Sequence, residues 1–432
     1  MNALRKTFFK YISLNIAGMI GLSCYILADT YFIAQALGSN GLASLNLSLT
    51  MFSTMYGIGL MIGIGAATDF ALHKAENAGV NVSLVHALVL CAIVAVAFAL
   101  LVLFGIEPLC YFLGADTETF HMTQTYLTTL LTFVPFFLLS TTMQAFVRND
   151  NNPKLAMISM LASSFANIGL DYLFMFPMSM GIFGAAFATG LSPIISLGVL
   201  LFHFVGKQHN LHLGKCKLSF RRMGTILSLG FTAFVGELAS AISLFTFNLL
   251  ILGIAGNIGV AAYGIVANFA MTAVCVYVGI SQGIQPLAST YYGQKDTPSI
   301  RFILKYALST GFVLSAILYI AVFVFAPNIA SAFNSEQDAG LQLLAIEGLH
   351  LYFVGYFFAC INIISAAFLS AIAKAGSATA IALCRSCFVL VPAAIICSRL
   401  WDMTGIWISF IATEAIVFVI TFVSLRKAMK GL

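Results

Sequence analysis

LGSNGLASL (37–45) and AGNIGVAAY (255–263) are two copies of one motif, and each copy opens a long apolar segment. At a spacing of 218 residues the segments 37–65 and 255–283 agree at Gly38 and Gly256, Gly41 and Gly259, Ala43 and Ala261, Thr54 and Thr272, Ile62 and Ile280, and Gly65 and Gly283. A weaker echo aligns QAFVRNDNNPKLAM (144–157) with AAFLSAIAKAGSAT (366–379), and GAAFAT (184–189) with GIWISF (405–410). Internal duplication in an apolar chain is typical of secondary transporters, so the repeat predicts two matching lobes.

The composition predicts that the lipid bilayer surrounds most of this chain. Of the 432 residues, 61% are hydrophobic and 8% are charged, whereas a soluble domain has roughly 45–50% apolar and about 25% charged residues. No soluble core could bury so much apolar surface. The formal net charge of +5 needs no nucleic-acid partner. We therefore expect the bilayer as a partner and no nucleic acid. We also expect small molecules as partners, as for other secondary transporters, and a monomer.

The length of the apolar segments predicts how often the chain crosses the membrane. A crossing helix needs about 20 residues, and segments of at least this length lie at 12–37, 42–72, 82–105, 120–147, 154–176, 181–205, 225–252, 259–290, 300–326, 343–372, 378–398 and 405–425. The predicted fold class is all-α integral membrane, with twelve transmembrane helices in two pseudo-symmetric six-helix lobes. The N-terminal lobe is expected at 1–205, a cytoplasmic linker at 206–224 and the C-terminal lobe at 225–432.

The basic residues predict the orientation. Of the 20 lysines and arginines, all but Arg385 and Arg399 fall at one set of predicted helix ends. The opposite loops contain acids, among them Glu107, Asp116 and Glu336. Because lysine and arginine gather on the cytoplasmic side, we expect both termini in the cytoplasm of a cell that carries this protein in its plasma or inner membrane.

Two carboxylates in the first lobe are the main candidates for function. A charge at mid-membrane costs at least about 2.5–3.5 kcal/mol, so acids inside spans are functional candidates by default. Asp29 and Asp171 lie about two-thirds along the first and fifth spans, which both start in the cytoplasm, so the two acids should share a depth. Asn167 lies one turn before Asp171 and faces the same side. Such a pair would take up a proton or hold a bare cation; the alternative is a polar clamp between helices.

The other three acids that we assign to spans have different expected roles. Glu237 lies in the middle of the seventh span, where no basic residue is predicted at its depth, so we favour a functional role. Glu414 is expected to form a structural pair with Arg385, the one basic residue inside a span. Asp69 lies one turn before His73 at the cytoplasmic end of its span and is expected at the interface. No nucleotide-binding motif or nucleophile–base set occurs, so we expect neither an enzyme nor a cofactor.

Three segments carry a resemblance to a known family. ADTYFIAQALGSNGLASL (28–45) resembles the first-helix signature of the multidrug and toxic compound extrusion (MATE) family. NIGLDYLF (167–174) with GIFGAAFAT (181–189) resembles its fifth-to-sixth helix segment, and GISQGIQPLASTYYGQ (279–294) its eighth-helix segment. The similarity covers about 12–425. It implies a multidrug efflux antiporter that exports organic cations or amphipathic compounds by alternating access, coupled to inward H⁺ or Na⁺.

The resemblance also implies site residues. The first-lobe cation site of the family maps onto Asp29, Tyr126, Asn167, Asp171 and Thr189, with Asp29, Asn167 and Asp171 as the ligands if the ion is Na⁺. Glu237 matches the second-lobe acid of other members, and Gln282 lies in the eighth-helix segment as a second candidate for substrate contact.

Two departures from the family pattern limit what the resemblance implies. The tenth helix of the sodium-dependent type carries an acid, and YFVGYFFACINIISAAFL (352–369) has none. The archaeal type has a proline early in its first helix, and NIAGMIGLSCYILAD (15–29) has only glycines there. The main alternative function is a lipid-linked oligosaccharide flippase, which would need basic residues in its central cavity. A passive channel is another, and it would need no buried acid pair.

Overall fold

The computed structural model describes residues 2–73, 81–205, 210–214, 216–334 and 338–430, and within these ranges the regular elements are helices. They are α1 (Asn2–Leu72), α2 (Val82–Phe104), α3 (Ile106–Phe112), α4 (Phe120–Thr132), α5 (Val134–Asn149), α6 (Pro153–Met175), α7 (Gly181–Leu200), α8 (Phe202–Val205), α9 (Phe220–Gly293), α10 (Thr297–Phe333), α11 (Ala339–Tyr352), α12 (Tyr356–Ala371), α13 (Ala375–Leu383) and α14 (Leu390–Lys430). A 3₁₀ turn (Phe353–Gly355) joins α11 to α12, and a π-helical turn (Cys384–Phe388) joins α13 to α14.

The helices account for the twelve predicted membrane crossings. Ten apolar segments among the described residues are long enough to cross, and α4 with α5, bent by 49° beside Pro135, makes an eleventh. One of the ten, Ala375–Lys430, has 56 residues. As one straight helix it would extend about 84 Å, far beyond the hydrocarbon thickness of about 30 Å. It breaks at Trp401 and Asp402, and we therefore count it as two crossings.

The duplicated motif produces the same backbone in both copies. Gly38 interrupts α1 with φ 64° and ψ −153°, and Gly256 interrupts α9 with φ 60° and ψ −152°. Residues with a side chain rarely adopt this combination, which glycine tolerates. The described part of α1 also begins 218 residues before α9. The repeat is therefore a repeat of structure, and each motif makes a sharp break between two spans.

The weaker echo is structural as well. Asn151 and Ala373, which occupy the same place in the second alignment, both have positive φ, at 65° and 60°. Gly181 and Asp402 both lie three residues before the third aligned pair of segments and have φ of 59° and 46°. The turns between helices therefore recur in the second half. They do so even where alanine replaces asparagine or aspartate replaces glycine, although a positive φ is less favourable for the replacing residue.

The chain divides into two compact units. We call Ser13–Phe234 the N-terminal unit, and Met1–Ile12 together with Val235–Leu432 the C-terminal unit. These divisions fall inside α1 and α9, whereas the boundary predicted from the residue pattern lies in the linker 206–224. Of that linker, 206–209 and 215 lie outside the described residues. Its described part packs on the N-terminal unit, because Leu211 is buried and the N–H of Asn81 donates to the carbonyl of His212 at 2.8 Å.

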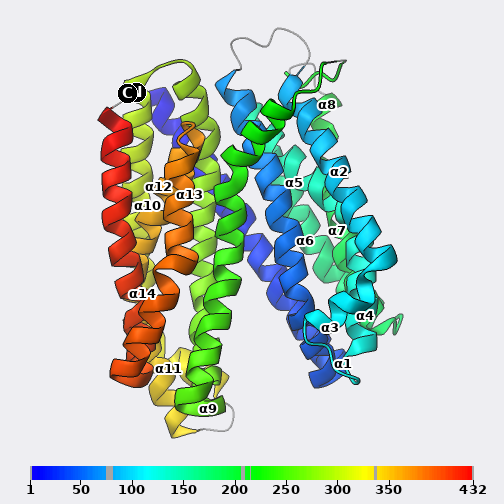
Figure 1. Cartoon of the computed structure of the whole chain (residues 1–432), viewed down its shortest axis with the longest axis vertical. Coiled ribbons are helices and arrows are strands. Elements are labelled where there is room, and N and C mark those ends of the chain that lie inside the picture. The colour runs from blue at the N-terminus through cyan, green and yellow to red at the C-terminus, as the bar shows by residue number, and fades with distance from the viewer. Residues whose placement is uncertain (1, 74–80, 206–209, 215, 335–337, 431–432) are drawn as a thin grey trace. The chain divides into compact units, whose positions relative to one another are not determined.

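The N-terminal unit is organised around α7. Within it, α6 runs along α7, α4 and α5 pack against α7, and α2 packs against α5 (Figure 1). Gly190 of α7 allows this close packing, since a Cβ there would collide with the ring of Phe133. The inner faces of α4, α6 and α7 therefore lie together, and these are helices on which the predicted cation-site residues are found.

Candidate functional site

Five predicted site residues come together inside the N-terminal unit, and we call them the acid cluster. Asp29 comes from the first segment of α1, Tyr126 from α4, Asn167 and Asp171 from α6, and Thr189 from α7. Each is at most 6% exposed to solvent. Residues 138 positions apart or more in the sequence, such as Asp29 and Asn167, thus share one buried site because four helices converge there.

Asn167 connects the cluster. With its amide oriented so that both ends are satisfied, Asn167 Nδ2 donates to Asp171 Oδ2 at 3.1 Å, and Asn167 Oδ1 accepts from the N–H of Thr189 at 3.3 Å. The charges of Asp29 and Asp171 are near enough to interact with each other. The hydroxyl of Tyr126 lies close enough to both carboxylates to interact with their charges, and it lies beside Thr189. The amide therefore fixes one carboxylate and leaves the other oxygens of the cluster for a ligand.

Several buried oxygens of the cluster have no partner among the described residues. They are Asp29 Oδ1, Asp171 Oδ1 and Thr189 Oγ1. Neither acid has a cationic side chain as an ion-pair partner within the described ranges. A buried carboxylate without a counter-charge is unfavourable, and a proton or a bound cation would remove the penalty. The geometry suits a small positive ion that is held by oxygens.

A cavity of about 50 Å³ adjoins the acid cluster within the N-terminal unit. It has room for a few water molecules. Thr189 belongs to both the cavity and the cluster. The lining combines aromatic, hydroxyl and amide side chains without a charged residue: Leu22, Tyr25, Phe52, Tyr56, Phe137, Ser140, Thr141, Gln144, Met160, Ser163, Thr189, Ser192 and Pro193. Gln144 Nε2 donates to Ser196 Oγ at 2.9 Å and to Ser140 Oγ at 3.3 Å, which fixes the polar side of this cavity.

The two candidates for substrate contact lie in the C-terminal unit. Glu237 is on the first segment of α9, is half-buried and makes no hydrogen bond or ion pair with any residue that the structure describes. Gln282 is on the second segment of α9, beyond Gly256, and is 5% exposed. A carboxylate that is neither fully solvated nor paired can attract an organic cation. The roles of Glu237 and Gln282 in substrate contact stay predictions.

The expected pair of Arg385 and Glu414 is present. Arg385 Nη2 lies 2.6 Å from Glu414 Oε1, and Glu414 is 1% exposed. Sequence reasoning missed the third member, Asn362 of α12, whose Nδ2 donates to Glu414 Oε2 at 2.8 Å and to the Glu414 carbonyl at 2.9 Å. A neutral amide in an apolar span gives little sequence signal, although its position opposite a buried acid would have been a reason to consider it.

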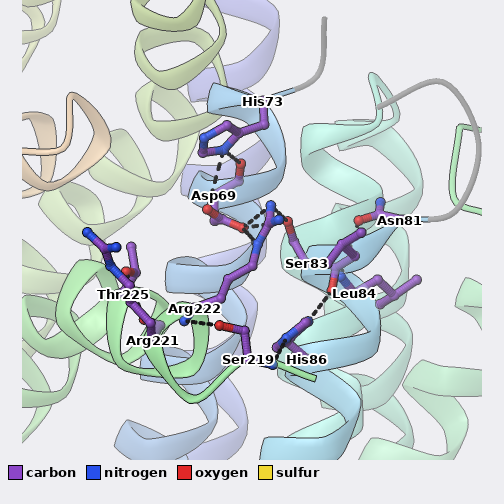
Figure 2. Close-up of polar contacts among 11 residues, drawn as sticks. Asp69, His73, Asn81, Ser83, Leu84, His86, Ser219, Arg221, Arg222 and Thr225 are labelled. Carbon is purple, nitrogen blue, oxygen red and sulfur yellow. Dashed lines mark hydrogen bonds and ion pairs between the residues drawn. The ribbon is translucent and has the colours of Figure 1, made fainter. Parts of the chain in front are cut away.

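One acid inside a span was missed from the sequence, and the partner of another was not predicted. Glu347 lies inside the predicted span 343–372 and should have been counted with the intramembrane acids; it accepts a hydrogen bond from Thr404 Oγ1 at 2.5 Å. Asp69, which we predict at the membrane–water interface, is 2% exposed and paired with Arg222 (Figure 2). The sequence did not indicate this partner, because Arg222 is 153 residues away and no local pattern points to it.

Comparison with known proteins supports the resemblance. The chain is 26% identical to the multidrug export protein MepA of Staphylococcus saprophyticus over 396 residues, which cover 91% of this chain and 87% of the relative. It is 24% identical to MepA of Staphylococcus aureus over 408 residues, with the same coverage.

Solved structures share the fold. An outward-facing multidrug resistance MATE family transporter of the MOP superfamily superposes with a TM-score of 0.92 at 21% identity, over 99% of this chain and 96% of that chain. A MOP superfamily transporter from Pyrococcus furiosus, described as having a binding pocket of reverse polarity, superposes with a TM-score of 0.90 at 22% identity. Residues 16–173 and 233–396 match the MatE family, which is most of the chain. The protein therefore belongs to the MatE family of membrane transporters.

Proposed function

We propose that this protein is a cation-coupled multidrug exporter that exchanges inward H⁺ or Na⁺ for outward organic cations or amphipathic compounds. The observation that carries the proposal is the acid cluster, in which Asp29 and Asp171 are buried together without a cationic partner among the described residues. A passive channel would have no reason to bury two such acids. The names of the MepA relatives support the substrate class.

The proposed cycle follows from the charge of the cluster. A positive ion that enters from outside neutralises the acid pair and favours the conformation that releases substrate outward; loss of the ion to the cytoplasm resets the cycle. Inward movement of one positive charge provides about 2.3 kcal/mol per 100 mV, and about 1.4 kcal/mol corresponds to a tenfold gradient. Exchange of one ion for one monovalent organic cation moves no net charge and is driven by the ion's concentration gradient alone, whereas a second ion, or a neutral substrate, lets the membrane potential support a steep gradient of substrate.

The neutral cavity beside the cluster has room for a few water molecules in this conformation, so it can receive only a part of a substrate molecule. The cavity offers aromatic faces, a methionine and hydroxyl groups, which adapt to planar amphipathic compounds. The flippase alternative has less support. A flippase would need a basic side chain that is free to bind pyrophosphate, and Arg385 is the basic residue that we predicted inside a span. Its guanidinium is paired with Glu414, which also accepts a hydrogen bond from Asn362.

Dye transport in proteoliposomes tests the proposal. The purified protein is reconstituted with an entrapped fluorescent organic cation, and a proton gradient and a sodium gradient are imposed separately. We expect either the proton or the sodium gradient to drive the dye against the concentration gradient of the dye. In a separate counterflow assay, we expect labelled dye to exchange with unlabelled dye across the membrane. Dye that only equilibrates, at a rate independent of both gradients, would contradict ion coupling and favour a channel.

A further inference from the structure

The ion pair of the C-terminal unit lies at the place that the cavity has in the N-terminal unit. At the spacings of the weaker echo, the three residues that meet at this pair have counterparts in the first half, and all three counterparts line the cavity. The matched residues are Asn362 and Ser140, Arg385 and Ser163, and Glu414 and Pro193. The repeat therefore puts charged side chains in the second half where the first half has a neutral cavity.

The carboxylate of Glu414 is the centre of this arrangement. Arg385 Nε lies 3.0 Å from each carboxylate oxygen, and Arg385 Nη2 lies 2.6 Å from Oε1. On the other side, Asn362 Nδ2 donates to Oε2 at 2.8 Å. The helices that supply these residues pack on one another, and Figure 1 shows α12, α13 and α14 side by side. The side chain of Glu414 is 2% exposed and that of Arg385 is 17% exposed, so the pair is buried without being sealed completely.

Aromatic side chains lie beside the guanidinium. The hydroxyls of Tyr352 and Tyr356 are close enough to Arg385 to interact with its charge, and both tyrosines are also within reach of the charge of Glu414. The ring of Tyr352 stacks on that of Phe410 with centroids 4.1 Å apart and an interplanar angle of 10°. Aromatic rings beside a carboxylate favour the binding of organic cations.

The surroundings of the pair also contain buried acceptors that the arginine does not use. Asn362 Oδ1 has no partner among the described residues, and neither does Ser365 Oγ, which lies one turn further along α12. Both residues are 0% exposed. A guanidinium is a flat group with several N–H donors. The site therefore combines one negative charge with additional oxygens, which suits a cation that donates several hydrogen bonds.

The backbone is specialised where the cation is attached. Arg385 lies in the π-helical turn Cys384–Phe388, in which the N–H of Val389 donates to the carbonyl of Cys384 at 3.0 Å. Its counterpart Ser163 lies in α6, an α-helix throughout. A π-helical turn changes the direction of side chains within a helix and is frequent at functional sites. The second half thus departs from the first at the residue that carries the positive charge.

The two units therefore differ in where their buried acids obtain a counter-ion. Asp29 and Asp171 of the N-terminal unit have no cationic side chain as a partner within the described ranges, so a proton or cation from solution must neutralise them. In the C-terminal unit, the counter-ion of Glu414 is a side chain of the protein itself.

We infer that Arg385 is a resident cation in a site of the C-terminal unit that is built for guanidinium-type organic cations. Glu414 supplies the negative charge of this guanidinium site, Asn362 supplies its amide group, and Tyr352 and Tyr356 lie beside it. Because the guanidinium is attached to the chain, the site stays filled and takes no ion from solution. The binding site depends only on these contacts, whereas its constant occupancy during transport rests on the proposed function.

Chemical rescue tests the guanidinium site without depending on transport. Arg385→Ala removes the ethylguanidinium part of the side chain, and free ethylguanidinium is the probe. We expect it to raise the thermal unfolding midpoint of full-length Arg385→Ala in detergent by about 2–4 °C in a saturable manner, because a ligand that binds only the folded state stabilises it. The wild-type protein should show no such rise, since Arg385 fills the site. No rise in the variant, or an equal rise in the wild type, would overturn the inference.

Three controls separate recognition of the cation from a general effect of the additive. Ethylurea has the same shape without the charge and should not stabilise Arg385→Ala. Addition of Glu414→Gln to Arg385→Ala should weaken the response to ethylguanidinium at least about tenfold, because the carboxylate is lost. Arg399→Ala is the matched control variant, since Arg399 is an exposed arginine of α14 and its removal should create no response. Rescue that survives Glu414→Gln would refute the site. If Arg385→Ala does not fold, Arg385→Gln, which keeps a donor for Glu414, takes its place in the same titration.

A neutral double variant tests constant occupancy. Arg385→Met with Glu414→Gln replaces the pair by uncharged side chains of similar length, and removal of both partners of a buried pair is often tolerated. Gradient-driven dye efflux should stay within about twofold of the wild type, because a resident cation is not exchanged. A folded double variant that loses at least about tenfold would show that the pair takes part in ion exchange, and would overturn constant occupancy. Asp29→Asn separates the two proposals, since it should stop coupled transport and leave the response of Arg385→Ala to ethylguanidinium unchanged.

Discussion

Arg385 contacts both carboxylate oxygens of Glu414, with Nε 3.0 Å from each oxygen and Nη2 2.6 Å from Oε1. The repeat relates this pair to the cavity of the other unit. At the spacing of the weaker echo, Arg385 and Glu414 correspond to Ser163 and Pro193, and both of these line the cavity of the N-terminal unit. The C-terminal unit thus has an ion pair where its counterpart has hydroxyl-lined space, which explains why two similar halves need not do the same work.

Breaking this pair should reduce the amount of folded protein. Arg385→Glu or Glu414→Arg alone would leave like charges buried together, and removing one partner of a buried pair costs about 3–5 kcal/mol. The double swap should restore part of the loss. Fluorescence-detected size exclusion after heating measures the midpoint for each variant. A double variant that is no better than either single variant would show that the pairing does not matter for stability.

Asp29→Asn and Asp171→Asn should each abolish gradient-driven dye efflux, a loss of at least about tenfold, and leave expression intact. Asparagine keeps the shape and hydrogen bonding of the side chain but cannot exchange a proton or attract a cation strongly. Glu118→Gln is the matched control, because Glu118 is an exposed acid between α3 and α4. This substitution should leave dye efflux unchanged. Wild-type efflux in both cluster variants would remove the coupling role of the acid cluster.

Glu237→Gln should weaken binding of cationic compounds and spare neutral ones. The carboxylate has no partner among the described residues, so its charge is free to attract a cation, an effect of up to about fivefold in affinity for a partly solvated pair. Fluorescence anisotropy with one cationic and one neutral dye of similar size measures the difference. Equal losses for both dyes would mean that Glu237 shapes the site rather than attracting charge.

The repeated turns predict opposite effects of glycine exchange. Gly38→Ala or Gly256→Ala should destabilise the fold by about 1–3 kcal/mol through backbone strain alone, since nothing lies within 4 Å of a Cβ at either position. Ala373→Gly should stabilise it by up to about 1 kcal/mol, because alanine at φ 60° is strained. Thermal unfolding in detergent gives the sign. A stabilised Gly38→Ala variant would show that the break at Gly38 is not maintained in the folded protein.

Much of the fold could be predicted from residue patterns. The twelve spans follow from apolar length, and the repeat that aligns Gly38 with Gly256 predicts two matching halves, in which the structure shows a break of the same geometry at each glycine. Helix ends were less predictable. The helices α1, α9 and α10 extend beyond their predicted spans, because a helix continues past the hydrocarbon as long as its backbone bonds are satisfied, and hydropathy reports only the buried part.

The site could be predicted only in part. Asn167 and Asp171 share a helix face, which spacing alone reveals, and their union with Tyr126 and Thr189 came from the family resemblance. The pairing of Asp69 with Arg222 had no sequence signal, since it joins the end of one span to the start of another that is distant in the chain. The Asn362 contact and the cavity were missed for the same reason.

What the sequence by itself determined is local and periodic: where the bilayer requires apolar residues, where glycine permits a positive φ, and which acids are too costly to bury without a purpose. What only the tertiary structure decided is which distant side chains meet, namely the closure of the acid cluster from four helices and the pairing of Asp69 with Arg222, and where α1 and α9 pass from one unit to the other. The physical reason is that hydropathy and backbone preference act along the chain, whereas ion pairing and packing depend on distances through space.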